Sequence, residues 1–280
     1  MVRVGVHLSI AGGVDRAVSR ALSKGCDTFQ IFSRNPRGWR AKELESGTVE
    51  RFVTAVKDSG IHPVVVHMPY LPNLACPNED VYLKSVDALS VEIKRCSILK
   101  IPYLVTHLGS HLGSGLEKGY LRAADGINKA LSKDDSDVIL LLENTAGTKN
   151  SVGGAFEDIS AIMDLIDRID RIGVCFDTCH AFVAGYEVRT REGLDATLKH
   201  FDEVIGLSQL KLLHINDTKG DLGSRLDRHE HIGLGMIGED GFRVILRDPR
   251  LRDLPMILET PVDQRRGDLD NIRKVRELAD

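Results

Sequence analysis

Short, nearly continuous apolar runs alternate along the chain with longer segments in which apolar residues follow a helical period. Eight of the runs have the length and the β-branched content of strands: Val2–His7, Thr28–Phe32, Pro63–His67, Tyr103–His107, Val138–Glu143, Ile172–Asp177, Leu210–Ile215 and Pro255–Glu259. Strands that are apolar at successive positions are typical of a parallel sheet, because both of its faces are covered by other parts of the protein.

The segments between these runs predict amphipathic helices. Val49, Phe52, Val53 and Val56 recur at the spacing of one helix face, and the stripe stops at Gly60, a residue type that commonly ends helices. Three further stripes have the same period: Leu121–Leu131, Ile159–Ile166 and Leu269–Leu278. Eight strands, each followed by a helical segment, predict an α/β fold of the closed (β/α)8 TIM-barrel type rather than an open doubly wound sheet.

The composition fits one globular domain over residues 1–280. No linker, low-complexity tract or block of charge interrupts the chain, and its length is close to the roughly 250 residues of such barrels. No run of about 18 apolar residues occurs, so we expect no membrane contact. Five scattered cysteines without a secretory signal predict reduced thiols in a cytoplasmic protein. No exposed apolar stripe requires a partner subunit, and we expect a monomer.

Residues that can bind a metal ion gather where the predicted strands end. Six consecutive runs carry one at or next to their last position: His67, His107, Glu143, Asp177, His214 and Glu259. Active sites of (β/α)8 barrels are built at the carboxyl ends of the strands, where side chains from different strands converge. The pattern therefore predicts one polar site at that end of the barrel.

Two loops add further candidate ligands. His180 follows Asp177 within one turn of chain, and the i, i+2 spacing of Asp227 and His229 points both side chains the same way in an extended segment. Imidazole and carboxylate ligands without thiolate favour zinc or manganese in a catalytic role. Nine candidates exceed the three or four protein ligands of one tetrahedral ion, and a site with several metals is typical of phosphoester hydrolysis.

Each of these residues also has an ordinary structural interpretation. A single histidine at a strand end is more often a hydrogen-bonded core residue than a metal ligand. Glu143 and Glu259 close apolar runs, and a buried carboxylate without a cation or a donor is costly, which favours a site role for both. For His7, His111 and His231 the sequence leaves a structural role and contact with ligands or substrate equally open.

Two long motifs are specific enough to point to a family. They are Gly173-Val-Cys-Phe-Asp-Thr-Cys-His-Ala-Phe-Val-Ala-Gly-Tyr186 and His214-Ile-Asn-Asp-Thr-Lys219, the second continuing through Gly223–His229 and Ile232–Gly238. Shorter stretches at 5–13, 107–111, 142–147 and 258–261 fit the same pattern. With these motifs the sequence resembles the endonuclease IV family of AP endonucleases over nearly its whole length.

The resemblance implies a DNA-repair enzyme with three Zn²⁺ ions per chain, with Mn²⁺ an option at one position. Its partner would be double-stranded DNA containing an abasic site, which it would cut on the 5′ side to leave a 3′-hydroxyl and a 5′-deoxyribose phosphate. The resemblance places the nine ligands in three sets, the first sharing Glu143 with the second: His67, His107 and Glu143; Asp177, His214 and Glu259; His180, Asp227 and His229. It also implies that metal-activated water attacks beside Glu143, the catalytic carboxylate.

The same resemblance assigns DNA contacts to Arg37, Tyr70 and Leu71. The residues at these positions would wedge into the duplex while the abasic nucleotide is flipped out, a step that costs less where base pairing is already lost. The formal net charge of −4 by itself disfavours a nucleic-acid partner. That count omits bound metals, so the charge near the site decides.

Two other functions compete with this interpretation. A sugar isomerase or epimerase on a related barrel would hold a single metal with Glu143, Asp177, His214 and Glu259, but it would not need the remaining candidates. A non-catalytic barrel that binds damaged DNA would not need a hydrolytic ligand set. Metal content distinguishes the first alternative, and cleavage of an abasic duplex excludes the second.

Overall fold

The computed structural model describes residues 2–280, and its centre is a closed barrel of eight parallel strands. In order around the barrel they are β1 (Arg3–Leu8), β2 (Phe29–Ile31), β3 (Val64–His67), β4 (Tyr103–His107), β5 (Ile139–Glu143), β6 (Ile172–Asp177), β7 (Leu210–His214) and β10 (Pro255–Leu258), with β10 pairing back onto β1. Each predicted strand is present, and its ends differ from the expected ones by at most one residue. The TIM-barrel prediction is therefore confirmed.

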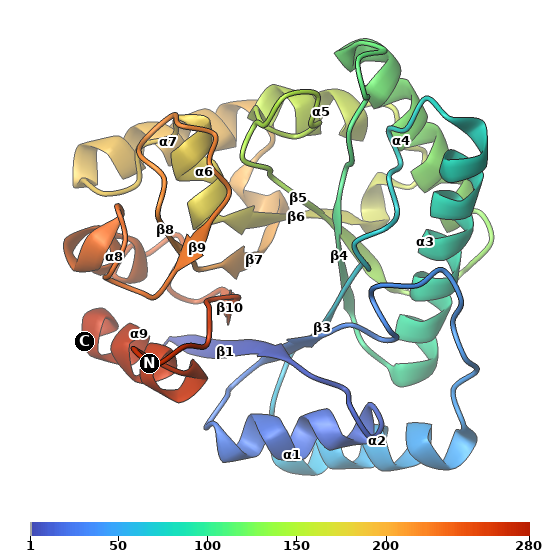
Figure 1. The fold of residues 1–280 in the computed structure, drawn as a ribbon, viewed down its shortest axis with the longest axis horizontal. Helices are drawn as coiled ribbons and strands as arrows, with labels where there is room; N and C mark the ends of the chain where they lie inside the picture. Colours follow the sequence, from blue (N-terminus) through green and yellow to red (C-terminus); the bar gives the residue numbers. More distant parts are fainter. Residues whose placement is uncertain (1) are drawn as a thin grey trace.

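Helices surround the barrel on its outside (Figure 1). They are α1 (Asp15–Ser23), α2 (Ser46–Ser59), α3 (Glu79–Leu99), α4 (Leu116–Leu131), α5 (Phe156–Met163), α6 (Thr178–Ala184), α7 (Arg191–Val204), α8 (Gly238–Leu246) and α9 (Asp268–Ala279). As predicted, α2 ends at Gly60, which adopts the left-handed conformation with φ of 71°. Short 3-10 turns precede β6 and β7, at Ile169–Arg171 and Leu207–Gln209.

The predicted helix stripes are partly wrong in detail. Leu121 is 58% exposed, because α4 turns a face of small residues, including Ala123 and Ala130, toward the barrel. Leu269, at the start of α9, is 38% exposed, whereas Ile272 is buried further along the same helix. The stripe expected to reach position 166 outlasts its helix, since α5 ends at Met163. The helical period located these helices but wrongly predicted that Leu121 and Leu269 are buried and that the helix of α5 extends to position 166.

Two apolar layers hold the barrel together. The larger one lies between the outward-facing strand residues and the helices, with members such as Val66, Leu104 and Phe201. The smaller one, which we call the inner plug, draws one residue from each of six strands: Val65, Val105, Leu141, Cys175, Leu212 and Ile257. Residues from six strands can contact one another only inside the barrel, as expected for the packed interior of this fold.

A small antiparallel ribbon lies outside the barrel sheet, near α6 in Figure 1. It pairs β8 (Asp217–Thr218) with β9 (His229–Glu230). The sequence predicted an extended segment here but not the pairing. In the described part of the chain, no helix combines the length and apolar character needed to cross a membrane. All five cysteines are buried free thiols, Cys179 among them.

Candidate metal centre

A layer of polar side chains lies directly above the inner plug, inside the barrel and nearer the carboxyl ends of the strands. Because side chains in a strand alternate between two faces, the residue two places after an inward one also faces inward. Counting two positions on from the plug residues reaches six of the candidate ligands: His67, His107, Glu143, Asp177, His214 and Glu259. On β1 and β2 the neighbours of His7 and Gln30 belong to the outer layer, so these two also face inward. Each of the eight strands thus contributes, at or next to its carboxyl end, one polar residue to a ring of eight.

Glu143 lies at the centre of this ring and is fully buried. Its Oε1 is 3.0 Å from His214 Nδ1 and 3.4 Å from His180 Nδ1. Its Oε2 is 3.2 Å from His67 Nε2 and 3.5 Å from His107 Nε2. The two oxygens of one carboxylate therefore face two different pairs of imidazoles, which is the geometry that a bridging ligand requires.

The charges of the cluster stabilise one another. Burial alone would raise the pKa of Glu143, but the imidazoles of His107 and His214 lower it well below its usual range. Burial would likewise lower the pKa of His180, and the carboxylates of Asp177, Asp227 and Glu143 instead raise it well above the usual value. A cation placed among these side chains would meet ionised carboxylates already held in position.

The nine predicted ligands form three compact groups. In each group, one ligand atom per residue lies within 4.8 Å of the others: His67, His107 and Glu143; Glu143, Asp177, His214 and Glu259; His180, Asp227 and His229. His229 Nε2 is buried without a hydrogen-bond partner, 3.9 Å from Asp177 Oδ2 and 3.7 Å from Asp227 Oδ1. A lone imidazole nitrogen facing two carboxylates fits a cation, so the residues present are suited to metal binding.

A fourth grouping places Cys179 near Asp177 and His229, with its sulfur within the same 4.8 Å limit. The sequence analysis treated this residue only as one of five reduced thiols. It is fully buried in the first turn of α6, the helix that Asp177 caps. Its position leaves it in contact with the ligand cluster while the mixed imidazole and carboxylate groups are complete without it.

Two asparagines that the sequence analysis did not single out hold the candidate ligands Asp177 and Glu259 in place, mostly through their backbone. Asn144 accepts a hydrogen bond from the Asp177 backbone N–H at 2.7 Å and donates one to its carbonyl at 3.1 Å. Asn216 donates to Asp177 Oδ2 at 2.7 Å and accepts from the backbone N–H of Glu259 at 2.8 Å. Each follows a ligand within two residues, a sequence signal that could have identified them.

The loop that carries Asp227 and His229 folds around a buried carboxylate, Asp217. Both of its oxygens accept hydrogen bonds from backbone N–H groups, which belong to residues 218, 233, 235, 237 and 238. Gly235 is required here, because an added Cβ would lie 2.3 Å from the Thr218 carbonyl oxygen and 2.5 Å from Asp217 Oδ1. The glycine-rich motif at 232–238 therefore shapes the ligand loop.

The three histidines whose roles the sequence left open lie in different surroundings: His7 lines the cavity, whereas His111 and His231 form hydrogen bonds within the protein. His7 lines the cavity above the ligands and packs its ring 4.3 Å from that of Phe32. His231 is fully buried, and its Nε2 lies 3.1 Å from Asp263 Oδ1, in the segment that follows β10. The Nδ1 of His111 accepts hydrogen bonds from two backbone N–H groups of its own loop.

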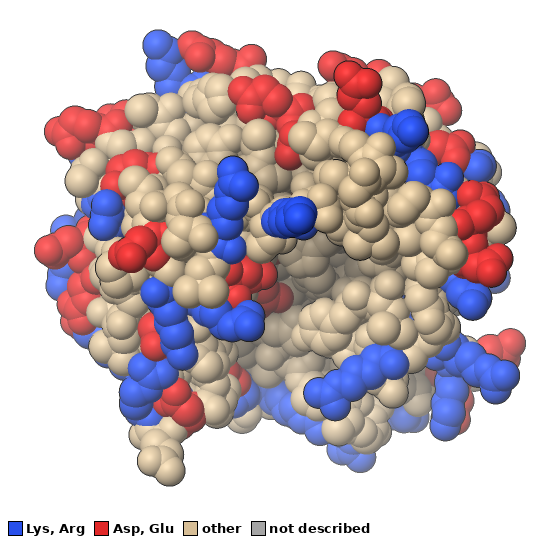
Figure 2. Space-filling view, turned by 45° about the horizontal axis from the view of Figure 1, so that its top comes forward, with Lys and Arg blue, Asp and Glu red and all other residues tan. Residues whose placement is uncertain are grey.

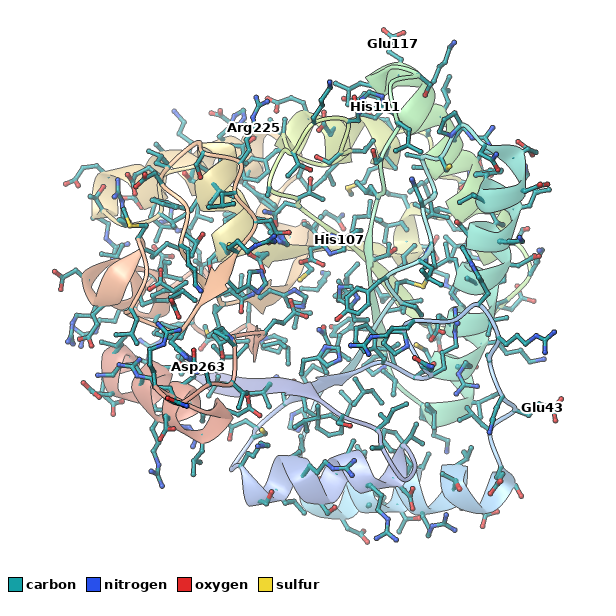
Figure 3. The ribbon with its side chains drawn as sticks, viewed as in Figure 1. Glu43, His107, His111, Glu117, Arg225 and Asp263 are labelled. Atoms are coloured by element: carbon teal, nitrogen blue, oxygen red, sulfur yellow. The ribbon has the colours of Figure 1, made fainter. Side chains whose placement is uncertain are left out.

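Figure 3 shows His107 directed into the central opening, whereas Glu43 and Glu117 point away from the molecule.

This cavity has a volume of about 740 Å³. Its lining includes His67, His107, His180, His229 and Glu259 together with Tyr70. His107 and Asp227 present their side chains to this space, since they are 44% and 51% exposed. Figure 2 shows a hollow in this face bordered by Lys and Arg side chains, with acidic residues inside it and toward the outer edges. Basic side chains thus border the hollow, whereas the acidic candidate ligands Asp227 and Glu259 line its interior.

Of the predicted DNA-contact residues, Tyr70 lines this cavity, whereas Arg37 and Leu71 line two further hollows that also include Tyr70. Tyr70 is 70% and Leu71 39% exposed, and Arg37 is exposed on the loop after β2. Arg37 and Tyr70 line the same hollow of about 420 Å³, in which the Tyr70 ring meets Phe32 edge-on at 5.1 Å. The structure therefore brings Arg37 and Tyr70 together beside the metal-type residues, although 33 positions separate them.

The loop that carries Arg37 is fixed to α3 by buried charges. Arg34 donates from Nε to Glu92 Oε1 at 2.6 Å and from Nη1 to the Gly38 carbonyl at 2.5 Å. Arg95 of the same helix donates to the Ser33 carbonyl at 2.5 Å. None of these anchors was expected from the sequence, because nothing in a helical stripe shows which loop will lie against it.

Comparison with known proteins agrees with the geometry. A family model described as a xylose isomerase-like TIM barrel matches residues 18–280. A protein of Methanoculleus marisnigri named "Probable endonuclease 4" is 63% identical over 280 residues, covering 100% of this chain and 99% of the relative. One of the same name from Cenarchaeum symbiosum is 50% identical over 280 residues, covering 99% and 100%.

Solved structures show the same architecture. Endonuclease IV from Thermus thermophilus superposes with a TM-score of 0.88 at 39% sequence identity, covering 99% of this chain and 98% of that one. A D-tagatose 3-epimerase-like protein superposes with a TM-score of 0.74 at 17% identity, covering 99% and 98%, and at that identity it shows the fold alone. The likeness in sequence and the likeness in fold thus extend over the same residues.

Proposed function

Because the chain belongs to the endonuclease IV family of AP endonucleases and is a metal-dependent DNA nuclease, we propose that it hydrolyses the phosphodiester bond on the 5′ side of an abasic site in double-stranded DNA. The products would be a 3′-hydroxyl and a 5′-deoxyribose phosphate. The observation that carries the proposal is the position of Glu143, whose two oxygens face two groups of proposed ligands, several of which line an open cavity.

We further propose that three Zn²⁺ ions bind in the three groups, with Mn²⁺ an option at one of them. His67, His107 and Glu143 would hold the first, and Glu143 would share the second with Asp177, His214 and Glu259. His180, Asp227 and His229 would hold the third. When bound, such ions supply a water of lowered pKa and offset negative charge on the phosphate.

The protein side chains would orient the substrate. Asp227 and His107 are the ligands most exposed to the cavity, so the scissile phosphate would approach on their side. Arg37, Tyr70 and Leu71 at the mouth would enter the duplex and occupy the space of the missing base, as an arginine and an aromatic ring can. The basic border of the hollow would contact backbone phosphates, which contribute most of the affinity of DNA-binding proteins.

The sugar isomerase alternative uses only part of this site. Its four ligands do form one compact group, Glu143, Asp177, His214 and Glu259. It leaves unexplained the two three-residue groups and the buried, unpartnered nitrogen of His229. About one metal ion per chain would favour the isomerase, and about three would favour the nuclease.

Metal analysis combined with an incision assay tests the proposal. We expect a duplex with one abasic site to be cut by the metal-loaded protein, and cutting to stop after chelation and return when Zn²⁺ is restored. We expect Glu143→Gln to lower kcat/KM at least 1000-fold, which corresponds to about 4 kcal/mol, while binding of the abasic duplex is retained. Incision that persists in Glu143→Gln would contradict the bridging role, and incision unaffected by chelation would contradict a metal-dependent reaction.

A further inference from the structure

Gln30 is the one residue of the inward ring whose side chain is neither an imidazole nor a carboxylate. It lies on β2, is fully buried, and contacts two of the proposed ligands that reach the site from distant parts of the chain. Its Nε2 is 2.6 Å from Glu259 Oε1, and its Oε1 is 2.9 Å from His214 Nε2. Its Nε2 is also 3.0 Å from His7 Nδ1.

The contact with Glu259 fixes which way the amide points. Two acceptor oxygens do not pair at 2.6 Å, so the NH2 group of Gln30 must face the Glu259 carboxylate. The second N–H of the same group then donates to His7 Nδ1. The amide oxygen consequently faces His214 Nε2 and accepts a hydrogen bond from it, so Nε2 is the nitrogen that carries hydrogen.

This hydrogen bond decides which nitrogen of His214 is available for a metal. With hydrogen on Nε2, the lone pair of the neutral ring lies on Nδ1. Nδ1 faces the centre of the four-residue group, 3.0 Å from Glu143 Oε1 and 3.5 Å from Glu259 Oε2. A metal-binding imidazole needs this arrangement, in which the nitrogen away from the metal donates a hydrogen bond and the nitrogen near it, here the one that faces Glu143, gives its lone pair to the metal.

We propose that Gln30 is a positioning residue that selects the His214 tautomer and holds the Glu259 carboxylate, so that both can bind the same metal ion. The proposal rests on the proposed metal-dependent function. Gln30 acts on both ligands at once, because a primary amide has an acceptor on one arm and donors on the other. A glutamate would place a second carboxylate against Glu259, and an apolar residue would leave both ligands without their partner.

The test is metal affinity in variants of β2. Gln30→Met keeps the length of the side chain and removes its hydrogen bonds to Glu259, His214 and His7. Zn²⁺ binding is measured by competition with a chromogenic chelator, and metal content by elemental analysis after dialysis. We expect the variant to bind one of its ions about 10- to 100-fold more weakly than the unaltered protein, the usual effect of losing a hydrogen-bonding partner of a ligand.

Thr28→Val is the matched control, two positions before Gln30. Thr28 is also fully buried, and its hydroxyl donates to the Pro63 carbonyl at 2.5 Å, away from the ligands. We expect Thr28→Val to hold all of its metal with unaltered affinity. Equal loss of affinity in both variants would show a general effect of disturbing this part of the barrel and would overturn the positioning role.

A second readout follows the histidine ring directly. In the ¹⁵N NMR spectrum of the metal-loaded protein, we expect a slowly exchanging Nε2–H on His214 that exchanges rapidly in Gln30→Met. If Gln30→Met fails to fold, Gln30→Asn, which shortens the amide by one methylene, gives the same comparison. Unaltered affinity and exchange in a folded variant would overturn the proposal for Gln30 alone, whereas an unaltered protein that binds no metal would overturn the proposed function.

Discussion

Replacing Asp217 by asparagine should release segment 229–238, the part of the ligand loop that follows Asp227, before the barrel unfolds. Asp217 is fully buried and accepts five backbone hydrogen bonds at 2.8–3.3 Å, four of them from the loop. Asparagine has one acceptor oxygen and an NH2 group in place of the second. The loop would therefore keep only part of its anchor, although the change adds no bulk.

The hydrogen-bond pattern sets the size of the effect. If the asparagine oxygen takes the place of Oδ2, it keeps the donors of Gly233, Gly235 and Gly238. The N–H groups of Thr218 and Ile237 then face another donor. A buried donor left unpaired costs about 1–3 kcal/mol, so two cost about 2–6 kcal/mol, a large share of the roughly 5–15 kcal/mol typical of whole proteins.

Hydrogen exchange on metal-free protein at pH 7 measures this cost locally, without a contribution from bound ions. We expect amides of residues 229–238 to exchange at least about 30-fold faster in Asp217→Asn, since about 2 kcal/mol corresponds to that factor. Asp240→Asn is the control, because Asp240 lies on α8 nearby and its side chain is fully exposed. Equal protection of the loop in the two variants would refute the anchoring role.

Two further predictions concern binding and pH. Arg37→Ala should weaken binding of an abasic duplex about tenfold with little change in kcat at saturation, and a change confined to kcat would contradict a wedge role. Burial alone would raise the pKa of Asp248, but the guanidinium of Arg250 lowers it. Because the folded pKa is the lower one, the ionised pair stabilises the protein above about pH 4 and this contribution is lost on acidification. Asp248→Asn should therefore lower the unfolding temperature at pH 7 but by less at pH 3, and an equal loss at both pH values would contradict this sign.

Much of the barrel and the ring of metal-type residues could be predicted, because both depend on local periodicity. The alternation within a strand fixes which residues share a face, and the carboxyl end of every barrel strand meets the same rim. That is why the sequence alone could place His67 and Glu143, 76 positions apart, in one cluster. The pairs Asp177/His180 and Asp227/His229 could be predicted because the two residues of each pair are close together in the sequence.

The supporting residues could not be found in this way. Gln30 lies 229 positions from Glu259, and the alternation of side chains along its strand places it inside the barrel without indicating which residues it contacts. In the sequence, Asp217 resembles an ordinary turn residue, and only the structure shows that backbone N–H groups of the glycine-rich segment donate hydrogen bonds to it. The anchoring of the Arg37 loop by Glu92 depends on how α3 lies against that loop, which no pattern within either segment encodes.

The inner plug gives the proposed metal site a single entrance. Its six apolar residues are fully buried and fill the barrel beneath the ring, so an ion would reach the ring from the carboxyl ends of the strands. A duplex bound across that mouth would then cover the route by which ions enter and leave. Metal exchange and DNA binding would then exclude each other, and the enzyme would replace a lost ion only between encounters with its substrate.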